Sequence, residues 1–159
     1  MAYGKINNKS GVIDRVKFKF ARIIISSFPL RSIRVWGLRL CGFRIGQKVY
    51  VGSGLCLTMP NSKSECILEV GDRVSIGPRV NLLLASDANW SNLNELYAPI
   101  EGRIRLEDDC WIGAGATILP NTTIGRMSIV GAGSIVTNDV PPFTVVAGNP
   151  SKIIKTIAK

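Results

Sequence analysis

Histidine is missing from this sequence of 159 residues. Its absence removes the side chain that most often serves as a general base near neutral pH, and it excludes Ser-His and Cys-His nucleophile pairs. A metal site that contains histidine is excluded for the same reason. The four cysteines show no C-x-x-C spacing that would predict a zinc knuckle or a redox pair. We therefore expect no metal site, and we expect reduced thiols of the kind found in cytoplasmic proteins.

Long hydrophobic runs and acidic residues are scarce at the start of the chain. The longest apolar run there is Ile23 to Ile25, so neither a signal peptide nor a membrane-spanning helix is expected. Residues 1–50 hold eleven Lys and Arg and one acid, Asp14, a charge of +10, whereas the other 109 residues hold nine basic and ten acidic side chains. The sequence thus divides into a basic N-terminal segment, residues 1–44, and a nearly neutral body.

The basic segment interleaves apolar and basic side chains on both sides of Pro29. This pattern predicts two short amphipathic helices separated by the proline. Such helices suit two roles: they can cover the open end of the body, or they can lie on an anionic membrane surface. No nucleic-acid-binding motif accompanies the charge, so we expect no nucleic-acid partner.

The rest of the chain, residues 45–150, shows a repeat of six residues. Aliphatic residues recur at this spacing without a slip at Leu106, Ile112, Ile118, Ile124, Val130 and Val136. A hexad with one branched aliphatic residue predicts a short strand and a tight turn, with the aliphatic side chain pointing into a core shared by stacked coils. The pattern indicates an all-β fold, because a helix has a different period and a β-sandwich lacks a strict hexad.

The hexads are interrupted at residues 83–103, which we expect to form a loop thrown out from the stacked coils. The loop is rich in amides and aromatic side chains, and long loops on a rigid scaffold often carry function. The candidate contacts to a sugar-like ligand are Ser86, Asn89, Trp90 and Asn92. A contact between subunits is the alternative role for this loop. We expect residues 151–159 to form a C-terminal tail.

Several segments of the repeat resemble the hexapeptide-repeat acyltransferases. The segments are Ile112–Pro120, Ile124–Gly125, Val130–Ser134 and Val145–Lys152, and the lead-in Leu40–Gly46 is similar to that of maltose, galactoside, capsule and O-antigen acetyltransferases. The resemblance implies a left-handed parallel β-helix of triangular section, with three hexads in each coil, and a homotrimer with active sites between neighbouring subunits. It also implies acetyl transfer from acetyl-CoA to a hydroxyl or amino group of a sugar or polysaccharide precursor.

The resemblance places the contacts to acetyl-CoA at Ala114, Ala132, Thr137, Asn138, Lys152 and Lys155, with Trp111 lining the cleft. Small residues beside turn glycines leave the backbone open to the amides of the pantetheine arm. The two lysines suit the CoA phosphates. Cys110 stands beside three acids, which disfavour a thiolate, so we expect it to be structural.

Asp87 stands where the resemblance places the family's catalytic histidine. A carboxylate with an ordinary pKa near ~4 is a weak general base near neutrality. Three interpretations stay open: desolvation in a subunit cleft makes Asp87 the base, the acceptor is an amine that attacks unaided, or the site is catalytically inactive. The last one leads to an alternative function, a β-helix trimer that binds a ligand or acts as a scaffold.

The basic segment also suits an acceptor that carries phosphate, such as a lipid-linked or nucleotide-bearing sugar. We expect Arg31, Arg34 and Arg39 to attract these phosphates. A cytoplasmic enzyme with peripheral membrane contact through its N-terminus would be consistent with such an acceptor.

Overall fold

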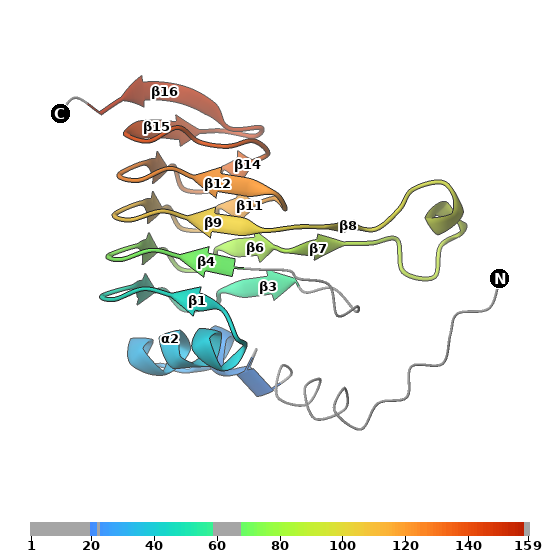
Figure 1. Ribbon diagram of the computed structural model, residues 1–159, viewed down its shortest axis with the longest axis horizontal. Helices are drawn as coiled ribbons and strands as arrows, with labels where there is room; N and C mark the ends of the chain where they lie inside the picture. Colours follow the sequence, from blue (N-terminus) through green and yellow to red (C-terminus); the bar gives the residue numbers. More distant parts are fainter. Residues whose placement is uncertain (1–19, 22, 59–67, 158–159) are drawn as a thin grey trace.

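The computed structural model describes residues 20–21, 23–58 and 68–157. Stacked coils of short strands form a prism, with helical residues below the first coil and a long hairpin projecting from one side (Figure 1). Strand partners in successive coils are parallel, and Ile112 and Val130 lie 18 residues apart. Each coil therefore contains three hexads. The prediction of an all-β fold built from stacked coils is confirmed.

Each complete coil contributes one strand to each of three sheets, called here sheets A, B and C, and sheet B has two further strands at its C-terminal edge. Sheet A contains β1 (Arg44–Ile45), β4 (Leu68–Val70), β9 (Ile104–Leu106) and β12 (Thr122–Ile124). Sheet B contains β2 (Tyr50–Val51), β5 (Ser75–Ile76), β10 (Trp111–Ile112), β13 (Ile129–Val130), β15 (Thr144–Ala147) and β16 (Lys152–Thr156). Sheet C contains β3 (Cys56–Thr58), β6 (Asn81–Leu83), β11 (Thr117–Ile118) and β14 (Ile135–Val136).

The C-terminal segment differs from its expected form. We expected a tail for residues 151–159, but Lys152–Thr156 form β16, which pairs antiparallel with β15. The pairing satisfies backbone groups that β15 would otherwise expose as the last strand of sheet B. The lysines of this segment therefore occupy fixed positions along a strand.

The hexad residues form the core of the prism. Each of the six consecutive ones is at most 1% exposed, which confirms that they point inward: Leu106, Ile112, Ile118, Ile124, Val130 and Val136. A second inward column lies two residues earlier on the same face of each strand. Its members vary in size along the chain and include Val74, Val80, Cys110, Ala116, Ser128 and Ser134. The hexad pattern does not reveal this column because its residue types change from coil to coil.

The turns between sheets repeat one backbone conformation. The third residue after an inward aliphatic residue has a positive φ, as in Arg73 (56°), Asp109 (60°) and Gly115 (68°). The residue directly after the aliphatic one is often glycine because the next coil lies against it. A Cβ on Gly113 would stand 2.5 Å from the backbone nitrogen of Ala132. The close stacking of backbone therefore explains this glycine of the hexad.

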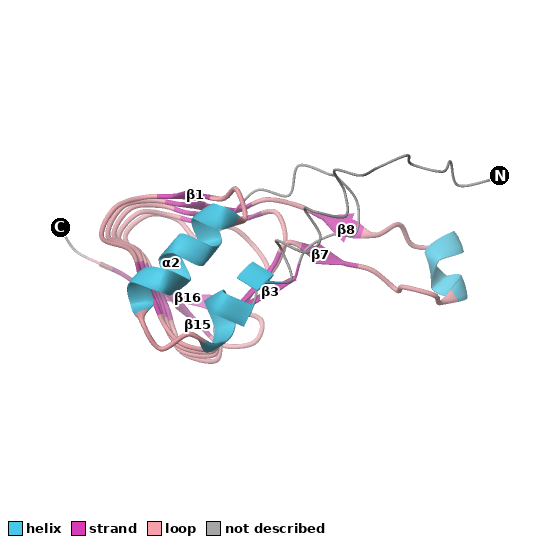
Figure 2. Cartoon of the chain, turned by 90° about the horizontal axis from the view of Figure 1, so that it is seen from below, coloured by secondary structure: helices cyan, strands magenta, loops and turns pink. Residues whose placement is uncertain are grey.

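Helical residues cover the N-terminal end of the prism on both sides of Pro29, as predicted (Figure 2). Residues 23–27 are helical before the proline, and α2 (Arg31–Leu40) follows it. Arg34 of α2 is only 5% exposed, and its Nε donates a hydrogen bond of 2.9 Å to the carbonyl oxygen of Val51. A charged side chain thus ties the helix to the first coil.

A long hairpin leaves the prism between sheet C and sheet A. Its elements are the antiparallel strands β7 (Ala85–Ser86) and β8 (Ile100–Glu101), with the 3₁₀ helix η1 (Asn92–Glu95) near the tip (Figures 1 and 2). The hairpin is shorter than the expected loop, residues 83–103, because Leu83 belongs to β6 and Leu84 is fully buried. The coil therefore continues up to Leu84 before the chain turns outward.

Candidate functional site

The path of the chain defines three corners of the prism, because each coil passes from sheet A to sheet B to sheet C. Turns after sheet B form the B–C corner, which holds Ala114 and Ala132 after β10 and β13. Turns after sheet C form the C–A corner, from which the hairpin with Asp87 projects. Thr137 and Asn138 follow β14 and lie at the C–A corner too. The predicted site residues are therefore divided between two corners.

The B–C corner presents exposed backbone at Ala114 and Ala132. A Cβ added at the neighbouring Gly115 or Gly133 would meet no atom within 4 Å, so open space faces these turns. The Ala114 carbonyl accepts a hydrogen bond of 2.8 Å from the Gly133 amide, whereas the Ala114 and Ala132 amides donate to no acceptor within the described ranges. Amides on a surface without large side chains are available to a ligand that carries carbonyl groups.

Trp111, Lys152 and Lys155 lie on sheet B beside this corner. Lys152 pairs with Ala147 at the end of β15 that leads into the B–C corner, and both lysines are exposed. The register of sheet B carries from Lys155 through Val145 to Trp111, so Lys155 and Trp111 share its outer face. Trp111 is 55% exposed. An aromatic ring and two cations thus stand next to the open backbone surface.

In the hairpin, Asp87 is exposed and its Oδ1 accepts a hydrogen bond of 2.9 Å from the Asn89 amide. Asn89 has a φ of 50°, and its carbonyl oxygen accepts a hydrogen bond from Asn94 Nδ2. An aspartate that bonds the amide two residues ahead is typical of a tight turn. The other loop candidates, Ser86, Trp90 and Asn92, are also exposed.

Asp87 and Ala114 lie at opposite ends of sheet C. Strands β6 and β11 are parallel neighbours, and Asp87 follows the carboxyl end of β6 while Ala114 precedes the amino end of β11. One chain therefore does not bring the candidate base to the candidate donor surface. If the two residues act together, different copies of the chain must supply them.

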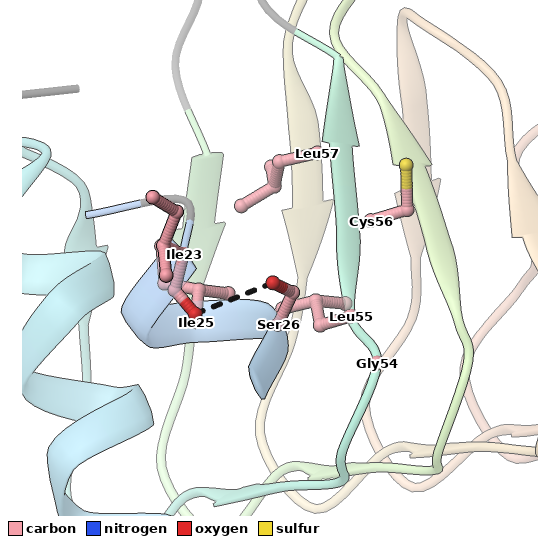
Figure 3. A pocket seen from close by; sticks show the side chains of 7 residues that line it. All are labelled: Ile23, Ile25, Ser26, Gly54, Leu55, Cys56 and Leu57. Atoms are coloured by element: carbon pink, nitrogen blue, oxygen red, sulfur yellow. Dashed lines mark hydrogen bonds between the residues drawn. The ribbon is translucent and has the colours of Figure 1, made fainter. Parts of the chain in front are cut away.

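Two hollows of the single chain lie away from these residues. One, of about 470 Å³, lies between helical residues 23–26 and β3 and is lined mostly by aliphatic side chains (Figure 3). The other, of about 270 Å³, surrounds the ion pairs of Glu69 with Arg44 (2.9 Å) and Arg105 (3.7 Å) on sheet A. Neither contains a predicted site residue, so the candidate residues line an open surface and not one of these hollows.

Two expectations about single side chains are decided by burial. The expectation that Arg34 attracts phosphates is wrong, because its guanidinium is buried and bonded to backbone carbonyls, whereas Arg31 and Arg39 are exposed. Cys110 is 1% exposed in the core, and burial raises the pKa of its thiol to about 12. The expectation that Cys110 is structural is confirmed.

Across the three described ranges, no group of three or more Cys, Asp or Glu side chains is arranged to hold a metal ion. No helix in the part of the chain that the structure describes is long and apolar enough to cross a membrane. The candidate chemistry therefore has to be built from the backbone, lysine, tryptophan and carboxylate groups described above.

Known proteins with the same repeat define the family. Residues 103–138 match the family model described as bacterial transferase hexapeptide (six repeats). A Staphylococcus aureus (strain Mu50) protein assigned as an acetyltransferase is 32% identical over 151 residues, which cover 95% of this chain and 71% of that protein. This chain belongs to the hexapeptide-repeat transferases.

The hexapeptide-repeat transferases share the left-handed parallel β-helix, which is the fold of this chain. Galactoside O-acetyltransferase of Escherichia coli (strain K12) is 34% identical over 113 residues, which cover 71% of this chain and 53% of that enzyme. A hexapeptide-repeat acetyltransferase from Vibrio cholerae is 24% identical, with a TM-score of 0.76 and coverage of 96% and 95%, and its structure complexed with acetyl-CoA is also known. The chain spans about half the length of several curated relatives.

Proposed function

We propose that this chain is an acetyltransferase that moves the acetyl group of acetyl-CoA to a sugar or polysaccharide precursor, and that it works as a homotrimer. The observation that carries the proposal is the division of the candidate residues between the open B–C corner, with Ala114 and Ala132, and the C–A corner, with Asp87. In the proposed trimer, three prisms with parallel axes are arranged so that the C–A corner of one chain lies beside the B–C corner of the next. The cleft between them then holds all of the predicted groups.

Exposed apolar side chains on the hairpin support the oligomer. Trp90 is fully exposed, and Leu96 (76%), Tyr97 (71%) and Ile100 (58%) follow on the same segment. So many large apolar side chains on one projecting segment are typical of a contact between proteins. The hairpin then lies over the neighbouring subunit and carries the candidate acceptor contacts into the cleft: Ser86, Asn89, Trp90 and Asn92.

The donor binds along the B–C corner in this proposal. The backbone amides of Ala114 and Ala132 donate hydrogen bonds to the carbonyl groups of the pantetheine arm. Lys152 and Lys155 stand at the C-terminal end of the prism, where they pair with the CoA phosphates. The remaining donor contacts are Trp111 on sheet B and, from the C–A corner of the neighbouring chain, Thr137 and Asn138.

The transfer takes place at the thioester carbonyl. The acceptor oxygen or nitrogen attacks the carbonyl carbon, so that a C–O or C–N bond forms and the C–S bond breaks. The acceptor proton passes to the Asp87 carboxylate and from there to the departing CoA sulfur, which leaves as a thiol.

Replacement of Asp87 tests its role in the reaction. With a hydroxyl acceptor, Asp87→Asn should lower kcat by roughly 10²- to 10⁴-fold while leaving acetyl-CoA affinity unchanged. With an amine acceptor, the variant should keep much more of its rate, and the pH–rate profile should follow the pKa of the amine. The matched control is Glu95→Gln, which removes another exposed carboxylate of the hairpin and should leave kcat unchanged. An Asp87→Asn enzyme with a wild-type rate on hydroxyl acceptors would overturn the assignment of the base.

The absence of histidine favours a second candidate function, a β-helix trimer that binds a ligand or acts as a scaffold without catalysis. The turn hydrogen bond of Asp87 is compatible with this role. Thioester turnover separates the two functions. A scaffold releases no CoA thiol from acetyl-CoA in the presence of any sugar acceptor, whereas the proposed enzyme releases one thiol for each acetyl group transferred.

We also propose that the N-terminal end of the prism contacts an anionic membrane on its cytoplasmic side. Large apolar side chains are more than half exposed there: Phe20 (63%), Ile23 (63%), Leu30 (59%) and Trp36 (53%). Arg31 and Arg39 are exposed beside them, and residues 15–64 contain no Asp or Glu. Aromatic and basic side chains together suit the interface of an anionic bilayer, where a lipid-linked sugar would be found.

A further inference from the structure

Two arginines occupy equivalent turns but differ in their partners. Arg73 and Arg79 both hold the third turn position, with φ values of 56° and 55°. The Arg73 guanidinium pairs with both carboxylate oxygens of Asp109 in the next coil, at 2.6 and 2.7 Å. The matching position above Arg79 is Gly115, and Arg79 forms no ion pair with the residues that the structure describes. Its exposed charge is therefore available to a ligand.

Arg79 interrupts a column of glycines at the B–C corner. The matching turn positions of the described coils are Gly54, Arg79, Gly115 and Gly133. The space over Gly115 and Gly133 is open, whereas a Cβ on Gly54 would stand 3.3 Å from Arg79 Cγ. The arginine stem thus lies over the first coil. The corner is open along two coils and ends at the coil that carries Arg79.

Arg79 and Asp87 belong to the same coil. Arg79 lies in the turn between β5 and β6, and the hairpin with Asp87 follows β6. The proposed donor runs from Lys152 past Ala132 and Ala114 toward this coil, so its thioester comes to the level of Arg79. Rotation about a threefold axis along the prism preserves this level, so Asp87 of the partner subunit reaches the same height. The acceptor has to enter beside Arg79.

We propose that Arg79 selects acceptors that carry an anionic group, a carboxylate or a phosphate, close to the hydroxyl or amine that is acetylated. The inference rests on the proposed function. A guanidinium presents two parallel N–H donors that fit both kinds of anion, and a neutral sugar makes no comparable pair with it. Arg73 has no such role because Asp109 already occupies its guanidinium.

The local backbone provides variants that keep the fold. Arg79→Gly removes the side chain at a position with a φ of 55°, which glycine adopts without strain. The matched control is Lys48→Gly, which also has a φ of 55° and also removes one positive charge, but at the corner between sheets A and B. Arg79→Lys keeps the charge and loses the planar pair of donors.

The experiment is a calorimetric titration of each protein, first with CoA and then, when saturated, with three sugars. The first sugar, methyl glucuronoside, carries a carboxylate, and the second, glucose 1-phosphate, carries a phosphate. The third, methyl glucoside, is neutral. The wild type and Lys48→Gly should bind the anionic sugars about tenfold or more tightly than the neutral one. Arg79→Gly should lose this preference, and Arg79→Lys should keep part of it. The anionic sugar that the wild type binds more tightly then identifies carboxylate or phosphate as the preferred group.

Three results would overturn the proposal. One is that the wild type shows no preference for the anionic sugars, either because it binds charged and neutral sugars equally or because it binds neither anionic sugar measurably. Another is a preference that survives in Arg79→Gly. The third is a loss of CoA affinity in Arg79→Gly, which would assign the arginine to the donor. Failure of the wild type to bind CoA in the first titration is a separate result, and it would overturn the proposed function together with this inference.

Discussion

Asp87 follows the carboxyl end of β6, and Ala114 precedes the amino end of the parallel neighbour β11, so the width of sheet C separates them within one chain. A reaction that uses both residues at one site must take them from different subunits. The same separation applies to Asp87 and Ala132, which precedes β14 in the same sheet. The oligomer is thus part of the proposed catalytic unit.

Mixed oligomers should recover activity from two inactive chains. Asp87→Asn removes the base and Ala114→Trp blocks the donor corner, so each variant alone should be inactive. Co-expressed at equal levels with random assortment, they should regain about a quarter of wild-type activity, because that share of clefts combines an intact hairpin with an intact corner. The measurement is CoA release by the co-purified complex.

The control for the mixed oligomers is Asp87→Asn co-expressed with the double variant Asp87→Asn/Ala114→Trp. No cleft in that complex has an intact Asp87, so it should show no activity. The subunit arrangement would be contradicted if the first mixture stayed inactive although both variants folded and assembled with each other.

Removal of the Arg34 guanidinium should loosen the N-terminal end of the prism. Arg34→Met leaves the buried carbonyl oxygen of Val51 and the partly buried carbonyl oxygen of Phe28 without their donors. The free energy of unfolding in urea should fall by roughly 2–4 kcal/mol, since buried acceptors lose charged hydrogen bonds. Arg31→Met, at an exposed position of the same helix, should change it by less than about 0.5 kcal/mol. Equal losses in the two variants would show that Arg34 does not tie the helix to the coil.

The buried thiol of Cys110 should make the protein less stable at high pH. Burial raises the pKa of this thiol from 9.0 to about 12, so the folded state favours the neutral form. Its contribution is complete below pH 9.0 and is lost as the pH rises toward 12, by up to about 1.4 kcal/mol per pH unit. Urea unfolding at two pH values, one on either side of 9.0, should show a smaller decline for Cys110→Ala than for the wild type. Cys41, whose pKa burial also raises, is present in both proteins, and an identical decline would contradict the prediction.

Vesicle sedimentation checks the proposed membrane contact. The wild type should bind vesicles that contain phosphatidylglycerol and should not bind vesicles of phosphatidylcholine alone. Arg31→Gln/Arg39→Gln should lower the bound fraction and make it less sensitive to salt, and Trp36→Ser should lower it at every salt concentration. Lys152→Gln removes a basic side chain at the opposite end of the prism and should have no effect. Binding that is the same for both lipids would refute an anionic docking surface.

The sequence predicts those parts of the fold for which every coil requires the same type of residue at the same position. Ile112 and Val130 must both be aliphatic and inward, so their spacing reveals the strands and the core. Cys110 and Ser128 belong to the second inward column, where the residue has only to fit the space available. The residue types therefore differ, and the sequence shows no pattern that identifies them. The strand Lys152–Thr156 was missed because its antiparallel pairing with β15 follows no hexad.

The sequence names a set of candidate site residues, but it does not give their arrangement. Counting sheets along the chain places Asp87 and Ala114 at different corners, and the observed strand register fixes this count. The insertion also hides contacts between coils: Arg73 pairs with Asp109, 36 residues away, whereas Ile112 and Val130 in the following pair of coils are offset by 18. Arg73 has an ion-pair partner in the next coil, whereas Arg79 has none among the described residues. This contrast appears only once the register is known.

The measurement that tests the central claim most directly is a calorimetric titration of the protein with acetyl-CoA, repeated with dephospho-CoA and with Lys152→Gln/Lys155→Gln. The proposed donor corner predicts saturable binding at one site per chain, weaker for the ligand that lacks the phosphate and weaker in the double variant. No binding at millimolar acetyl-CoA would contradict the account and leave a β-helix trimer without CoA chemistry.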